Sequence, residues 1–100
     1  MKIRIAIPFH LRNLAQCERE VTVELNGKPA TIGNVLDALE AKHPVLRGTI
    51  RDHGTLKRRD FLRYYACNAD LSLEPGETEL PADVANGKEP FIVLGSIAGG

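Results

Sequence analysis

Residues 90–100 read PFIVLGSIAGG, an apolar run that gives way to small residues ending in two glycines. The consecutive apolar residues from Phe91 to Leu94 predict a strand buried on both faces. Such strands lie in the middle of a sheet and often pair in parallel with a neighbour. Residues 96–100 predict a flexible tail whose root is held by that strand. This stretch therefore predicts a sheet with a two-sided central strand and a projecting chain end.

Two segments near the start of the chain alternate apolar and polar residues. Isoleucine recurs at every second position of residues 2–7, and valine and leucine do the same in residues 20–25. This period of two is typical of strands with one buried face. Pro8 and Asn26 mark their ends. We expect an antiparallel hairpin whose connection, residues 9–19, is a loop.

The apolar period changes to that of a helix after residue 30. Thr31 is a favourable N-cap, and apolar residues follow at positions i, i+3, i+4 and i+7. This stripe consists of Ile32, Val35, Leu36 and Leu39. Pro44 ends the helix, because the residue before a proline is pushed out of the helical region. We expect one main helix that packs on the sheet through this stripe.

The rest of the chain completes one domain covering residues 1–100. Residues 45–53 predict a short second helical turn, and residues 61–67 predict a third strand whose buried face the pattern leaves open. Residues 70–87 contain several proline and glycine turn signals and predict a loop. The order β-β-α-β-β predicts an α+β fold with a mixed sheet of four to five strands and one main helix packed on it.

Composition narrows the classes of function. The chain has 100 residues, and thirteen basic residues offset thirteen acidic ones, so the formal net charge is zero. This balance argues against nucleic acid or an anionic membrane as partner. No apolar run approaches the roughly 20 residues that span a bilayer, and the charged N-terminus lacks a signal-peptide core. We therefore expect a cytoplasmic protein.

The reactive side chains show no enzyme or metal-site spacing. The two cysteines, Cys17 and Cys67, lie far apart and the three histidines are scattered, so we expect no metal site. Cys67 is interpreted as a buried small hydrophobe, while the exposure and reactivity of Cys17 stay open. The basic cluster within residues 57–63 is interpreted as a solvated loop and strand edge. The alternative is a contact with an acidic partner or with RNA phosphates.

The end of the chain carries the main chemical hypothesis. Gly99 and Gly100 lack Cβ and pass a narrow channel easily, and four extended residues reach roughly 13 Å. The reactive group would be the carboxylate of Gly100, a poor electrophile that ATP activates most simply as an acyl-adenylate. A sulfur nucleophile or an amine then displaces AMP. The chain has no phosphate-binding loop for ATP, so activation must come from a partner.

Several segments together resemble a known family. These segments are the Thr31 helix running into HPVL at residues 43–46, the YACN strand end at residues 65–68 and the terminal IAGG at residues 97–100. In these three segments the chain resembles the MoaD/ThiS family of ubiquitin-like sulfur carriers. The tail is also similar to that of CysO-type carriers. The resemblance implies the β-grasp, or ubiquitin-like, fold.

The resemblance also implies a role for the chain end. Gly100 would be adenylated by an E1-like adenylyltransferase that uses ATP with Mg²⁺, and a rhodanese-type sulfurtransferase would supply the sulfur of a thiocarboxylate. The thiocarboxylate then donates sulfur to an acceptor biosynthetic enzyme, such as one making molybdopterin or the thiazole of thiamine. Gly99 accompanies the reactive residue, and Ser96, Ile97 and Ala98 position the tail in the partner.

On this interpretation the protein is a cosubstrate with no bound cofactor, not an enzyme, or else a small subunit of a sulfur-transfer complex. Two alternatives stay open. One is a ubiquitin-like modifier conjugated to lysine through Gly100, and the other is a β-grasp binding module without tail chemistry. Because ordering a short tail costs about 1–2 kcal/mol per residue, a carrier needs a further docking face. We expect that face to be hydrophobic and to lie beside the root of the tail.

Overall fold

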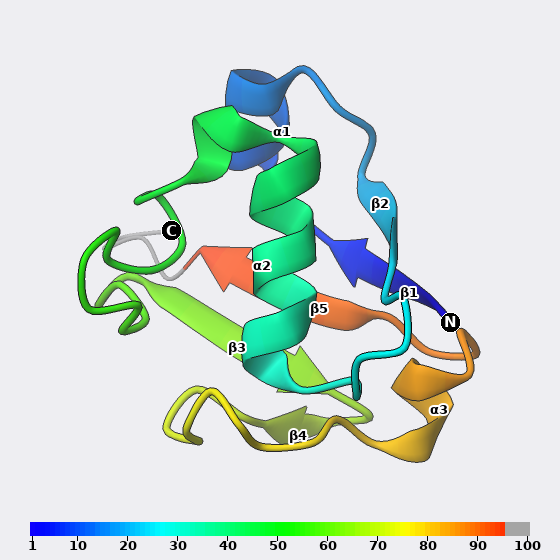
Figure 1. Cartoon of the computed structure of the whole chain (residues 1–100). Helices are drawn as coiled ribbons and strands as arrows, with labels where there is room; N and C mark the ends of the chain where they lie inside the picture. The colour runs from blue at the N-terminus through cyan, green and yellow to red at the C-terminus, as the bar shows by residue number, and fades with distance from the viewer. Residues whose placement is uncertain (96–100) are drawn as a thin grey trace.

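The computed structural model describes residues 1–95, which form one five-stranded mixed sheet with helices packed on it (Figure 1). The strands are β1 (Lys2–Ala6), β2 (Glu20–Glu24), β3 (Leu62–Ala66), β4 (Ala69–Asp70) and β5 (Phe91–Gly95). The helices are α1 (Phe9–Ala15), α2 (Ile32–Lys42), the 3₁₀ helix η1 (Pro44–Leu46) and α3 (Ala82–Ala85). The strand order across the sheet is β2-β1-β5-β3-β4.

β5 occupies the middle of the sheet, as its apolar sequence predicts. It pairs in parallel with β1, where Ile5 lies opposite Phe91, and antiparallel with β3, where Leu62 lies opposite Gly95. The parallel pairing places the C-terminal ends of β1 and β5 at the same end of the sheet. The predictions of a central strand, a parallel neighbour and an antiparallel pair of N-terminal strands are confirmed.

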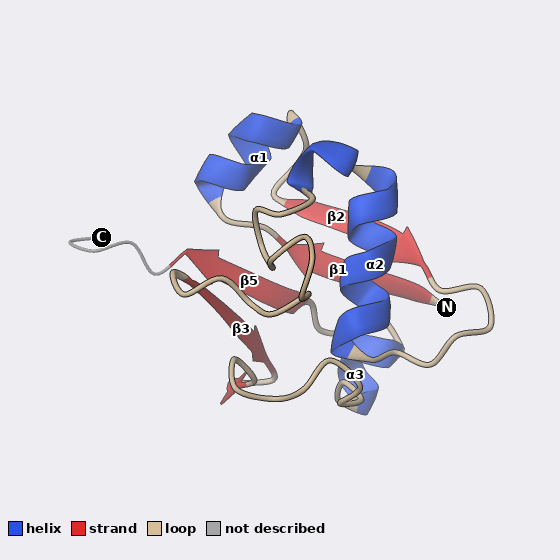
Figure 2. Ribbon diagram, turned by 60° about the vertical axis from the view of Figure 1, so that its left-hand side comes forward, coloured by secondary structure: helices blue, strands red, loops and turns tan. Residues whose placement is uncertain are grey.

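α2 covers one face of the sheet, as Figures 1 and 2 show from two sides. The helix begins where predicted, because the Thr31 hydroxyl accepts a hydrogen bond from the backbone N–H of Asn34 at 3.0 Å. It ends at Lys42, just before Pro44. Its predicted apolar stripe is buried against the core-facing side chains of the strands, including Ile3, Ile5, Phe91 and Val93.

The expectation that β5 is buried on both faces is wrong. Phe91 and Val93 are fully buried beneath α2, but Ile92 is only partly buried and Leu94 is 46% exposed on the opposite face. Because successive side chains of a strand alternate between faces, an apolar run needs cover on both sides to be buried throughout. Here the second face of β5 has no such cover from the described residues.

The connection between β1 and β2 is also not the predicted loop. It contains α1, whose first turn is closed by the Pro8 carbonyl accepting hydrogen bonds from the N–H groups of Leu11 and Arg12. Leu11 is the one fully buried residue of this short helix. A single buried residue gives no repeating apolar pattern, so the sequence does not predict the helix. Gln16 ends the helix with a positive φ of 53°.

The third strand resolves an ambiguity and corrects the interpretation of Cys67. The core face of β3 carries Leu62, Tyr64 and Ala66. Cys67 lies beyond the strand and is exposed rather than buried. Cys67 and Asn68 both have positive φ, 51° and 65°, which is the geometry of a tight two-residue hairpin turn. This turn leads to the two-residue strand β4, which overlaps the start of the loop predicted for residues 70–87. The short helix α3 lies within that predicted loop.

The segment between α2 and β3 is anchored by a buried ion cluster. The expected second helical turn is present as η1, shorter than predicted, and Leu46 and Ile50 are fully buried as its spacing predicts. Arg51 is 4% exposed and donates from Nε to Glu40 at 2.8 Å, while Nη2 binds Asp37. Burial opposes the charged form of Arg51, but these two carboxylates outweigh it and raise its pKa. The cluster therefore ties the segment between η1 and β3 to α2 at Arg51.

Candidate docking face and chain end

The uncovered face of the sheet carries a group of apolar side chains over β3 and β5. Cross-strand partners share a face, so Ile92 lies beside Tyr65 of β3 and Ala6 of β1, and Leu94 lies on the same side of β5. Phe61 precedes β3 with the same alternation and is 67% exposed. We call these residues the open-face patch, and it consists of Ala6, Phe61, Tyr65, Ile92 and Leu94.

The open-face patch lies at the end of the sheet where β5 finishes. Leu94 is followed by Gly95, the last described residue, which pairs with Leu62 at the start of β3. Phe9, 71% exposed, follows the end of β1 at this same end of the sheet. Three exposed or half-exposed apolar side chains from separate segments thus gather at the root of residues 96–100. A hydrophobic surface lies where the sequence predicts a docking face.

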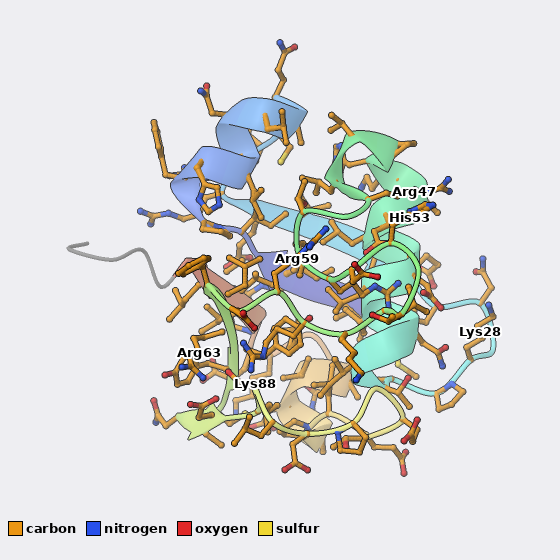
Figure 3. The ribbon with its side chains drawn as sticks, turned by 90° about the vertical axis from the view of Figure 1, so that its left-hand side faces the viewer. Lys28, Arg47, His53, Arg59, Arg63 and Lys88 are labelled. Carbon is orange, nitrogen blue, oxygen red and sulfur yellow. The ribbon has the colours of Figure 1, made fainter. Side chains whose placement is uncertain are left out.

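Charged side chains lie within this patch and at its edge. Arg63 lies directly opposite Leu94 on β3, and Figure 3 shows it on the side of the molecule where β5 ends. On the neighbouring strands Arg4 holds Glu20 through two hydrogen bonds of 2.8 and 2.9 Å. The hydrogen bond from Arg4 lowers the pKa of Glu20. The patch therefore has one arginine among its apolar side chains and an ion pair at its edge, and the enrichment of aromatic residues and arginine is common in protein–protein interfaces.

The basic cluster predicted from residues 57–63 is divided by the structure. Arg58 turns inward and donates to the backbone carbonyls of Ser72, Arg59 and Leu62. Arg59 binds the carbonyl of Gly48 and lies 3.9 Å from a carboxylate oxygen of Asp52. Lys57 is exposed, so the solvated interpretation holds for part of the cluster, while Arg58 ties the loop together.

The residues predicted to carry the chemistry lie outside the described residues. They are Ser96, Ile97, Ala98, Gly99 and Gly100. The structure thus supplies the surface around the root of this segment, and the roles of its residues stay predictions. Within residues 1–95 no three His, Cys, Asp or Glu side chains gather as a metal site requires. None of the helices in that range is long and apolar enough to cross a membrane.

Ile92 and Leu94 were predicted to be core residues from the apolar run of residues 91–94, so their position at the surface was not expected. A signal was present in the neighbouring strand, where Phe61, Arg63 and Tyr65 alternate with residues of the core face. An arginine at the middle position indicates that this face of β3 meets solvent. A strand paired with β3 must share that solvent-facing side.

Comparison with solved structures identifies the fold. The crystal structure of SAMP1 from Haloferax volcanii aligns over 100% of both chains with a TM-score of 0.75 and 21% identity. A chain of the Amycolatopsis orientalis BexX/CysO complex aligns over 97% of this chain and 98% of its own, with a TM-score of 0.73 and 22% identity. Mycobacterium tuberculosis CysO, described as an antigen, covers 94% of this chain and 98% of its own with a TM-score of 0.69 and 22% identity.

The chain has the ubiquitin-like β-grasp fold. The fold expected from the MoaD/ThiS resemblance is therefore confirmed, including the five-stranded mixed sheet and the main helix packed on it. No protein-family model and no curated protein sequence matches the chain. At about one identical residue in five, these alignments establish architecture, and the function must be argued from the site.

Proposed function

We propose that this β-grasp protein is a sulfur carrier whose Gly100 carboxylate is adenylated by an E1-like enzyme and converted to a thiocarboxylate. The carboxylate oxygen attacks the α-phosphorus of ATP and releases pyrophosphate. A sulfide-level nucleophile then attacks the acyl carbon, and AMP leaves. The thiocarboxylate passes its sulfur to a substrate held by an acceptor enzyme. In this role the protein is a cosubstrate, and ATP with Mg²⁺ belongs to the activating partner.

The observation that carries the proposal is the open-face patch at the root of the chain end. A carrier must present its terminus to at least two enzymes, so it needs a docking surface next to that terminus. Leu94 and Phe61 are exposed there although neither stabilises the core. Among the structures that this chain resembles, one holds CysO together with BexX, which supports docking of such a fold on a partner protein.

A second function shares the activation step. The name small archaeal modifier protein favours conjugation, in which a lysine amine rather than sulfur displaces AMP. The product is then an amide between Gly100 and another protein. The two functions differ only in the acceptor of the acyl group, so the chemical state of Gly100 separates them.

The deciding experiment is the intact mass of untagged protein purified with its E1-like partner, with fragmentation that places any change on a residue. A carrier shows sulfur in place of one oxygen at Gly100, whereas oxidation of Cys17 or Cys67 adds nearly the same mass elsewhere. An unchanged carboxylate, together with higher-mass conjugates, would establish the modifier function. An unchanged Gly100 without ATP consumption by the partner would reject both.

The docking step has its own test. Replacing Leu94→Asp should lower kcat/KM for adenylation about tenfold or more, because central apolar contacts dominate interface energies. Val45→Asp, at a side chain of matched exposure in η1, is the control and should leave the rate unchanged. We also expect Ile97→Asp to weaken adenylation while the fold stays intact. Equal rates for Leu94→Asp and wild type would remove the open-face patch from the proposal.

A further inference from the structure

A second surface feature lies on the opposite side of the sheet from the open-face patch. A groove of about 860 Å³ runs between the first half of α2, the loop at residues 51–58 and the segment at residues 72–77. In Figure 1 the first of these segments, in green, lies to the left of α2, and the second, in yellow, lies below it. The groove exists because α2 lies over the centre of the sheet and leaves the core-side face of β3 partly uncovered. Its volume is that of a typical small-molecule site.

A buried hydroxyl group lines this groove without a hydrogen-bond partner. Tyr64 is only 4% exposed, and its ring packs against Phe91 with 5.4 Å between ring centroids. No described residue makes a hydrogen bond with its hydroxyl, and the oxygen is not sealed from solvent. Burial raises the pKa of Tyr64 to about 12, so the group stays protonated and can donate. Because solvent reaches the oxygen, water can satisfy it, and a ligand atom that enters the groove can take the place of that water.

A guanidinium group lies in the same groove without a carboxylate. Arg58 is partly buried, and Nε and Nη1 donate to three backbone carbonyls. Within residues 1–95 no carboxylate forms an ion pair with it, and Nη2 makes no hydrogen bond. Arg58 and Tyr64 both line the groove. By contrast, the Arg51 charge is matched by Asp37 and Glu40. The free donors therefore select an anionic oxygen.

The walls of the groove define the rest of the ligand. Leu73 is 86% exposed and Leu56 is 52% exposed, on opposite sides of the opening. Leu56 has a φ of 62°, a conformation unfavourable for leucine. Three exposed carboxylates also line the groove, those of Asp37, Glu74 and Glu77, and they would repel a dianion such as a phosphate monoester more strongly than a monoanion. These features together fit one negative charge on an apolar body.

We propose that this groove binds an organic monocarboxylate with an aliphatic body. One carboxylate oxygen accepts from the Tyr64 hydroxyl, the other accepts from Nη2 of Arg58, and the aliphatic part lies between Leu56 and Leu73. The site is separate from the chain end and adds small-molecule binding to the proposed carrier function. It requires no activating enzyme, so its test is independent of the chemistry at Gly100.

The test is an amide chemical-shift titration with hexanoate, and with hexanamide as the uncharged probe of matched shape. Hexanoate should shift amides of residues 51–58 and 72–77 with a dissociation constant in the low millimolar range, an affinity well within what so few atoms can supply. Tyr64→Phe removes only the hydroxyl and should weaken hexanoate about fivefold. Leu73→Ser should weaken it by a similar factor, whereas Leu14→Ser on α1, the control, should not.

Three results would each overturn the proposal. The first is the absence of localised shifts at about 20 mM hexanoate, beyond the expected range. The second is hexanamide binding as tightly as hexanoate, which would mean a merely apolar groove. The third is full affinity in Tyr64→Phe with its fold intact, judged from an otherwise unchanged amide spectrum.

Discussion

Both faces of β5 carry apolar side chains, but only one of the two faces is buried within the chain. Phe91 and Val93 lie beneath α2 and are fully buried, while Ile92 and Leu94 point to the uncovered face. The comparison shows that an apolar residue in a central strand is not necessarily a core residue. On one face it stabilises the fold, and on the other it forms a surface that another protein can cover.

The difference also separates two kinds of energetic role. A side chain between α2 and the sheet contributes to folding because its burial removes apolar area from water within the chain. A side chain of the open-face patch would contribute the same kind of energy only when a partner docks. Substitutions on the covered face should therefore change stability, and those on the open face should change association. The following predictions test this division.

The largest loss of stability is expected from Phe91→Ala. The side chain is fully buried and packs on Tyr64, so its loss should reduce the free energy of unfolding by about 4 kcal/mol in urea denaturation. Leu94→Ala, on the same strand, should cost less than about 1 kcal/mol. Comparable losses for the two variants would contradict the division between the faces.

Arg51→Met should be the next most damaging change. It leaves Glu40, which is 8% exposed, without its partner, and a stranded buried carboxylate costs about 3 kcal/mol. The double variant Arg51→Met with Glu40→Leu should recover more than half of this loss, because no buried charge then remains. Urea midpoints of the two variants check the prediction, and a double variant no more stable than the single one would show that packing, not charge, matters here.

The adjacent tyrosines of β3 allow a spectroscopic comparison of the faces. In the Tyr65→Phe variant the remaining tyrosine, Tyr64, should form phenolate near pH 12, because burial raises its pKa from the ordinary 10. The folded state keeps this proton while the unfolded state loses it. Stability from this group is thus complete below pH 10 and falls as pH rises toward 12. Ultraviolet absorbance follows the titration, and ionisation near pH 10 while the protein is still folded would refute it.

The smallest loss of stability should come from a change at the N-cap of α2, the helix that covers the sheet. Thr31→Ala removes the hydroxyl that accepts from Asn34 N–H, which should lower stability by about 1 kcal/mol. Thr31→Ser keeps the hydroxyl and should behave nearly as wild type. Thermal or urea unfolding distinguishes the two, and equal losses would mean that the methyl group rather than the cap is responsible.

Much of the fold could be predicted from local sequence patterns. The alternation in residues 2–7 and the cap at Thr31 each depend on neighbouring residues, and both are confirmed. α1 could not be predicted, because one buried leucine leaves almost no helical period. Cys67 could not be placed, because its strand ends one residue earlier in a turn of positive φ. For the candidate site, the apolar docking surface was expected, while two of its members, Ile92 and Leu94, had been assigned to the core.

The sequence by itself determined the order of the four longer strands and the main helix, the position of the central strand and the chemical hypothesis for Gly100. These follow from period, turn residues and residue type along the chain. Only the tertiary structure decided which face of β5 is covered and that Tyr64 and Arg58 line one groove. The burial of these side chains depends on where α2 and residues 51–58 pack on the sheet. That placement is set by contacts between residues far apart in the chain, which no local pattern records.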